Sequence, residues 1–141
     1  MLFIDTSAYL ARYLAKDQYH DPAMAFWEEL KTKHEGLVTS NFVLDETATL
    51  LGRRAGHVFA SNRLKAVYAS SVLQIWRPDR DDELRAIDWF AKFQDQDVSF
   101  TDCISFTLMK RGRIHHVFSF DRHFDTAGFK RLPILPYSHR A

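Results

Sequence analysis

MLFIDTSAYLARYLAK, residues 1–16, places a short apolar run, one carboxylate and a helical pattern in direct succession. The apolar residues 1–4 show no alternation with polar residues, which is typical of a strand that is buried on both faces. Residues 7–16 carry apolar side chains at helical spacing. The stretch therefore predicts a strand that leads through Asp5 directly into a helix, which is the repeating unit of an α/β fold.

The same alternation of short apolar runs and longer helical patterns continues along the chain. We predict further strands at 37–40, 72–76, 115–120 and 132–135, and helices over 21–36, 41–56, 57–71, 79–94 and 103–111. The helix over 21–36 has Asp21 as its predicted N-cap, Pro22 at the first helical position and Gly36 as its C-cap. Helices of this length between consecutive strands predict a five-stranded, mostly parallel sheet with helices on each side.

Length and composition limit the class of protein. A chain of 141 residues is long enough for a domain with its own core, and we predict one domain over residues 1–141. Hydrophobic residues make up 46% and charged residues 26%, which is typical of a globular protein rather than a disordered or fibrous one. The formal net charge is only +1, but residues 100–141 hold 7 Lys and Arg against 3 Asp and Glu. This basic third is compatible with a polyanionic ligand, and equally with a solvated face.

The number of cysteines and the first residues of the chain give information on the cellular compartment of the protein. Cys103 is the only cysteine, so neither an intramolecular disulfide nor a cysteine-based zinc site can form, and we expect it to pack as a small apolar side chain. The opening MLFID has no basic segment, and no stretch approaches the roughly 20 apolar residues of a membrane span. We therefore expect a cytoplasmic protein without a membrane segment.

Four acidic residues lie where a parallel sheet would bring them together. Asp5 and Asp121 directly follow predicted strands, and Asp102 begins the helix that leads into the fourth strand. Glu46 lies two turns into the helix after the second strand, on an apolar stripe where a carboxylate needs a partner. Because sites in parallel sheets form at the carboxyl ends of the strands, these carboxylates can converge on one spot.

Three of these acids also have a purely structural explanation. In VSFTDCIS, Asp102 could complement a helix start, with Ser99 or Thr101 as the N-cap. Asp5 could simply end a strand, and Asp121 could stabilise a turn. The sequence alone therefore leaves both a structural and a functional role open for each of them.

A cluster of carboxylates is costly without a cation, because like charges a few ångströms apart raise each other's pKa and destabilise the fold. A bound divalent cation removes this cost, and Mg²⁺ prefers oxygen ligands and commonly bridges carboxylates to a phosphate. One or two such ions can activate water and stabilise the attacking and leaving oxygens of a displacement at phosphorus. The pattern therefore favours hydrolysis of a phosphate ester with Mg²⁺ or Mn²⁺.

Four motifs, in this order, resemble those of the PIN-domain ribonucleases, including the VapC-type toxins of prokaryotic toxin–antitoxin pairs. They are FIDTSAYL at 3–10, the acid in NFVLDETATLL at 41–51, SFTDC at 99–103 and FSFDRHF at 118–124. The resemblance covers almost the whole chain and implies a three-layer α/β/α sandwich. It also implies metal-dependent cleavage of RNA, a homodimer and a small antitoxin partner.

The resemblance also implies roles for individual residues. The family's acidic tetrad, taken as the catalytic residues, corresponds to Asp5, Glu46, Asp102 and Asp121. Of these, Asp5 and Asp102 fall at the positions that usually contact the metal. Neighbouring hydroxyl side chains that would orient ligands or water are Thr6, Ser7 and Thr101. Asp125 is a candidate for a further acid.

Two other functions remain open at this point. A non-catalytic RNA- or protein-binding PIN domain would share the fold, although a binding module has no need of a repulsive tetrad. A Mg²⁺-dependent phosphatase is the second alternative, because FIDTS is similar to the DxDx[TS] start of haloacid-dehalogenase-type enzymes. Ser7 stands where those enzymes need a second acid, which argues against this alternative.

Some features of the sequence bear on binding partners. An antitoxin segment would need an apolar groove, for which the aromatic-rich helices that contain Phe26, Trp27 and Phe42 are candidates. His115 and His116 are adjacent strand residues that face opposite ways, so we do not expect them to share a metal ion. Basic side chains that could meet phosphates, in directions that the sequence does not define, are Lys110, Arg111, Arg113, Arg122 and Lys130.

Overall fold

A parallel sheet of five short strands forms the centre of the protein in a computed structural model that describes residues 1–136. The strands are β1 (Leu2–Ile4), β2 (Leu37–Ser40), β3 (Leu73–Trp76), β4 (His116–Phe118) and β5 (Lys130–Leu132). Their order across the sheet is β3-β2-β1-β4-β5, and all four pairings are parallel. The predicted sheet is therefore confirmed and is parallel throughout, while residues 137–141 of the predicted domain lie outside the described residues.

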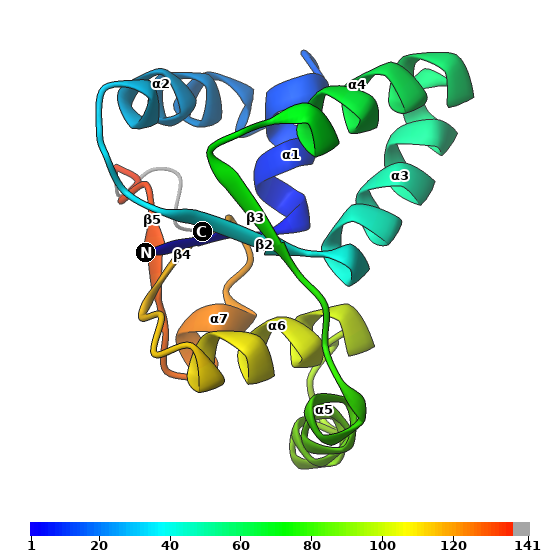
Figure 1. The fold of residues 1–141 in the computed structure, drawn as a ribbon, viewed down its shortest axis with the longest axis vertical. Helices are drawn as coiled ribbons and strands as arrows, with labels where there is room; N and C mark the ends of the chain where they lie inside the picture. The colour runs from blue at the N-terminus through cyan, green and yellow to red at the C-terminus, as the bar shows by residue number, and fades with distance from the viewer. Residues whose placement is uncertain (137–141) are drawn as a thin grey trace.

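Within the described part of the chain, seven helices cover the two faces of this sheet (Figure 1). One layer contains α1 (Thr6–Tyr13), α2 (His20–Lys31), α3 (Asn41–Ala55) and α4 (His57–Ala69). The other contains α5 (Arg80–Lys92), α6 (Phe100–Arg111) and α7 (His123–Thr126). This is the three-layer α/β/α sandwich that the family resemblance implies. Within residues 1–136, no helix is both long enough and apolar enough to cross a membrane.

The central strand β1 decides where a site can form. Its residues Leu2, Phe3 and Ile4 are completely buried, as expected for a strand covered on both faces. It pairs with β2 on one side and with β4 on the other, with Leu2 opposite both Leu37 and His116. Since all three strands run in the same direction, the segments that follow them emerge at one edge of the sheet.

The fifth strand does not lie where the sequence predicted it. The prediction of a strand at 132–135 is wrong, because β5 covers Lys130–Leu132 and its last pair joins Leu132 to Phe118. Pro133 follows directly, and a proline has no N–H group with which to continue the ladder. The apolar run at 132–135 is therefore largely the exit from the strand.

The predicted helix over 21–36 also differs from the observed one. α2 begins at His20 and ends at Lys31, so Asp21 lies in the first turn and is not the N-cap. After Lys31, the Thr32 hydroxyl donates a hydrogen bond of 2.8 Å to the Glu29 carbonyl and helps to end the helix. The exposed residues 32–35 bury no apolar surface that would extend the helix to Gly36.

The acidic start of α5 has a structural role. Asp79 is the N-cap and forms a capping box with Asp82, each side chain accepting from the other residue's backbone N–H. Asp82 is buried and also accepts a hydrogen bond of 3.0 Å from Nε of Arg111 on α6. These acids therefore join α5 to α6 and need no function beyond that.

Candidate active site

Asp5 connects the central strand to the first helix. Its side chain caps α1, and it is only 3% exposed. Oδ2 of Asp5 accepts hydrogen bonds of 2.8 Å from both Ser7 Oγ and Ser119 Oγ. The structural explanation for Asp5 is therefore confirmed, since the residue follows β1 and caps α1. The two hydroxyl donors also hold its carboxylate in one orientation at the edge of the sheet.

Ser7 was predicted from the sequence as a hydroxyl neighbour of the site, whereas Ser119 was not. The Ser7 hydroxyl also accepts from the backbone N–H of Phe120 at 2.9 Å, and the Ser119 hydroxyl accepts from that of Asp121 at 3.0 Å. The two serines thereby tie the start of α1 to the segment that follows β4. Ser119 lies two residues before Asp121 in the motif FSFDRHF. It directly follows a buried strand, and this position could have identified it as a residue of the site.

Asp102 lies in the first turn of α6 and is 6% exposed. Ser99 is the N-cap, and the two residues form a capping box: the Ser99 hydroxyl accepts from the Asp102 N–H at 3.0 Å, and Asp102 Oδ2 accepts from the Ser99 N–H at 3.2 Å. The capping explanation for Asp102 is therefore confirmed, with Ser99 rather than Thr101 as the cap. Capping does not remove this carboxylate from the site, because the charge of Asp5 raises the pKa of Asp102.

The remaining acids differ in their surroundings. Glu46 is half-buried on α3, while its neighbour Asp45 is exposed. The Asp121 side chain is 30% exposed and accepts a hydrogen bond of 2.9 Å from the backbone N–H of His123. Asp125 instead pairs with Arg131 through two hydrogen bonds of 2.9 and 2.8 Å. Its charge is therefore already compensated, and it does not act as an additional acid of the cluster in this structure.

The electrostatics of the four acids show that they form one cluster. Burial and then the charges of Asp121 and Glu46 raise the pKa of Asp5 to about 6, against the lowering effect of its two serine donors. Burial and then the charges of Asp5, Asp121 and Glu46 raise the pKa of Asp102 to about 8. Among residues 1–136, no Lys or Arg forms an ion pair with any of the four carboxylates.

A histidine completes the arrangement. Single donor atoms of Asp102, Asp121 and His123 all lie within 4.8 Å of one another, which is close enough for one cation. Carboxylate oxygen and imidazole nitrogen are both ligands for divalent metals. This group differs from the predicted metal pair, Asp5 and Asp102, because it contains His123 and not Asp5. His123 lies in the motif FSFDRHF but was not among the predicted site residues.

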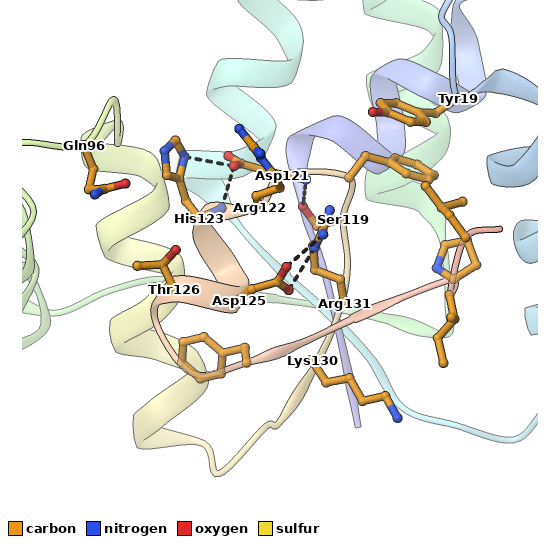
Figure 2. Close-up of a pocket in the computed structure, with 15 residues that line it drawn as sticks. Tyr19, Gln96, Ser119, Asp121, Arg122, His123, Asp125, Thr126, Lys130 and Arg131 are labelled. Atoms are coloured by element: carbon orange, nitrogen blue, oxygen red, sulfur yellow. Dashed lines mark hydrogen bonds and ion pairs between the residues drawn. The ribbon is translucent and has the colours of Figure 1, made fainter. Parts of the chain in front are cut away.

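A pocket of about 980 Å³ opens beside Asp121 and His123 (Figure 2). Its lining includes the basic residues Arg122, Lys130 and Arg131. In Figure 2, Arg122 lies beside Asp121, whereas Lys130 lies at the far end of the pocket. The structure thus defines the positions of Arg122 and Lys130, which could not be determined from the sequence.

Aromatic residues and the remaining basic residues surround this pocket differently. Tyr19 and Phe120 also line it, with their rings stacked at a centroid distance of 4.6 Å. Lys110 and Arg111 instead line a separate groove with Trp89, between α5 and α6. The pocket beside Asp121 therefore combines an acidic end, a basic lining and an aromatic wall.

Residues 2–130 of the chain match the PIN domain family. The chain is 36% identical over 129 residues to the 23S rRNA-specific endonuclease VapC20 of Mycobacterium tuberculosis, covering 92% of this chain and 95% of that protein. It is 30% identical over 123 residues to the VapC ribonuclease of Archaeoglobus fulgidus, covering 86% of this chain and 77% of that protein.

Solved structures agree with these relationships. The crystal structure of Mycobacterium tuberculosis VapC20, described as a Sarcin-Ricin loop cleaving toxin, superimposes with a TM-score of 0.84 at 35% identity and covers 92% of this chain and 96% of that one. FitAcB from Neisseria gonorrhoeae superimposes with a TM-score of 0.68 at 14% identity, covers 94% and 97%, and so shares the fold alone. The chain belongs to the PIN-domain family, in the branch that contains the VapC ribonucleases.

Proposed function

We propose that this chain is a metal-dependent endoribonuclease whose catalytic residues are Asp5, Glu46, Asp102 and Asp121. The observation that carries the proposal is a cluster of four mutually repelling carboxylates at one edge of the sheet, with no Lys or Arg of the described residues as a partner. Repulsion between these like charges destabilises the fold unless a cation is bound among them. The ribonuclease activity named for relatives that align over most of their length supports the same reaction.

The residues present fit a divalent cation, because the cluster offers several carboxylate oxygens without a counter-charge. Asp5 and Asp102 are the proposed ligands, and Mg²⁺ or Mn²⁺ the proposed ion. When bound, such an ion supplies an activated water and stabilises negative charge at phosphorus. Ser7 and Ser119 keep the Asp5 carboxylate oriented through their hydroxyl hydrogen bonds. We assign to Glu46 and Asp121 the positioning of the attacking water or of a second ion.

A phosphatase is not favoured by any feature of the site. Ser7, which stands in place of the second acid of such enzymes, is committed to hydrogen bonds with Asp5 and the Phe120 N–H. A binding-only PIN domain would keep the fold but gain nothing from the repulsion between Asp5 and Asp102. The ribonuclease therefore accounts for more of the structure than either alternative.

The substrate proposed for this nuclease is a structured RNA loop of the large ribosomal RNA. VapC20, with 36% identity over 129 residues, is named as specific for 23S rRNA and as cleaving the sarcin–ricin loop. In this chain, the pocket beside Asp121 could hold a strand next to the scissile bond. Arg122 is exposed there and forms no ion pair among the described residues, so it is free to meet a phosphate.

The partner proposed for this chain is a small antitoxin, since the related VapC20 is described as a toxin. Of the predicted docking residues, Trp27 lines a groove of about 310 Å³ between α1, α2 and α4. Phe26 instead packs edge-on against Phe118 in the core, and Phe42 packs edge-on against Phe100. The groove that contains Trp27 is therefore the proposed docking surface, since neither Phe26 nor Phe42 lines it. A homodimer is also proposed, from the family resemblance alone.

Loss of single acids should abolish cleavage. We expect Asp5→Asn and Asp102→Asn to reduce cleavage of a sarcin–ricin stem-loop RNA by about 100-fold or more, since each removes a charge that holds the cation. Excess EDTA should have the same effect on the wild type, and expression of Asp5→Asn should not arrest growth where the wild type does. Asp45→Asn, one residue from Glu46 but exposed, is the matched control and should cleave normally. Cleavage that persists in EDTA would contradict the metal mechanism.

The metal-free protein should lose stability as the pH rises. Asp102 has a pKa of about 8 in the folded protein and near 4 when unfolded, so between these values the folded state binds the extra proton and stability falls with pH. Asn at this position keeps a hydrogen-bond acceptor for the Ser99 N–H but does not titrate. The melting temperature of Asp102→Asn minus that of the wild type should therefore rise by roughly 5 °C between pH 4 and pH 8.

Thermal scans in EDTA measure this difference, and Asp45→Asn should show no comparable change. Saturating Mn²⁺ should raise the melting temperature of the wild type more than that of Asp102→Asn. A pH-independent difference would show that the charge of Asp102 is not repelled in the folded protein.

Arg122 should contribute to RNA binding. We expect Arg122→Gln to raise KM about fivefold with little change in kcat, because a contact to a phosphate outside the reacting atoms mainly affects binding. The slope of log affinity against log salt concentration should fall by about 0.7 to 0.9, the value for one phosphate contact. Arg113→Gln is the control, since Arg113 precedes β4 and therefore lies at the opposite edge of the sheet. An unchanged salt dependence would place the RNA elsewhere.

The groove with Trp27 should capture the partner. When the chain is co-expressed with the small protein of the neighbouring reading frame, we expect the two to co-purify. Val72 lines this groove and is 68% exposed, so Val72→Glu should prevent capture by placing a charge in an apolar contact without disturbing the core. Val58→Glu, at a 77% exposed site outside the groove, is the matched control and should leave capture intact. Equal capture by all three proteins would argue against this groove.

A further inference from the structure

The imidazole of His123 has an unusual environment at the edge of the acid cluster. Its Nδ1 atom is buried and lies 2.9 Å from Oδ1 of Asp121, yet it makes no aligned hydrogen bond to any described residue. The same Asp121 oxygen already accepts a well-formed hydrogen bond from the backbone N–H of His123. A nitrogen and a carboxylate oxygen at this distance, without a shared hydrogen bond, need either a proton or a cation to hold them together.

The spacing of the neighbouring donor atoms fits a cation. Donor atoms of Asp102, Asp121 and His123 lie within 4.8 Å of one another. Two ligands in adjacent positions around an octahedral ion, bound at roughly 2.1 Å each, are roughly 3 Å apart. The 2.9 Å between His123 Nδ1 and Asp121 Oδ1 matches this separation. The side chain is also only 24% exposed, so water has limited access to compete for the nitrogen.

We propose that His123 Nδ1 is a ligand, together with Asp102 and Asp121, of a divalent cation at this site, and that it makes this position prefer Mn²⁺ over Mg²⁺. The inference rests on the proposed metal-dependent nuclease and names a further residue of the same site. The preference follows from ligand chemistry, since Mg²⁺ favours oxygen ligands and retains water, whereas imidazole nitrogen suits transition metals. Two carboxylates and one imidazole would distinguish the two ions where carboxylates alone would not.

The competing explanation is that His123 only positions Asp121. A protonated imidazole beside Asp121 would form an ion pair, and its loss would disturb the carboxylate for every metal alike. If His123 is a ligand, its replacement should lower the affinity for one metal more than for the other. The two explanations therefore differ in the ratio of Mn²⁺ to Mg²⁺ affinity.

Titration calorimetry with each metal alone tests the proposal on the intact chain. The wild type should bind Mn²⁺ more tightly than Mg²⁺. His123→Ala should weaken Mn²⁺ binding by about tenfold or more and Mg²⁺ binding by less than about threefold. His123→Gln, which keeps a polar side chain of similar reach, serves if the alanine variant melts early in thermal scans without metal. His115→Ala is the matched control, because His115 is exposed and precedes β4 at the opposite edge of the sheet.

Each outcome decides between the explanations. An equal loss for both metals, or no loss for either, overturns the ligand role of His123. If the wild type binds both metals and cleaves RNA while the affinity ratio is unchanged in the His123 variants, only this inference fails. If the wild type binds neither metal and cleaves no RNA with either, the proposed function itself fails.

Discussion

The structure depends on one constraint: a carboxylate is buried at the end of the central strand of the sheet. Asp5 is 3% exposed, and the strand before it is completely buried. Burial disfavours the charged form, which is the largest cause of its raised pKa. Two serine hydroxyls hydrogen-bond to the carboxylate and partly offset this cost. The local structure thus keeps an ionisable group in an unfavourable place, which is typical of residues retained for chemistry rather than for folding.

The order of the strands determines which side chains share this constraint. Because β1 lies between β2 and β4, the segments that follow these three strands meet at one edge. The segment after β4 carries Ser119 and Asp121, and the helix after β2 carries Glu46. Asp102 arrives from the opposite layer on the first turn of α6 (Figure 1). Asp121, more than 100 positions away in the chain, therefore raises the pKa of Asp5.

Much of this could be predicted from the sequence, and the reasons are physical. Apolar runs without alternation indicated the buried strands, and an acid directly after such a strand, as with Asp5, indicated the edge where a site would form. Ser119 and His123 could not be assigned in the same way, because their roles depend on contacts with residues distant in the sequence, or with backbone groups whose positions only the fold defines. Asp125 illustrates the converse: the sequence offered it as an acid of the site, but Arg131 in β5 pairs with it. The position of β5 was itself mispredicted, so this pairing could not be anticipated.

Asp102 shows why structural and functional explanations of one residue need not compete. In the capping box, the backbone N–H of Ser99 donates to the Asp102 carboxylate and holds it in place, whether or not a cation is present. A ligand that is held in this way loses little conformational entropy when an ion binds, which favours binding. The same hydrogen bond lowers the pKa of Asp102, but burial and the neighbouring acids outweigh it. The helix start therefore supplies the position of the carboxylate, and the cluster around it supplies the repulsion that a cation would relieve.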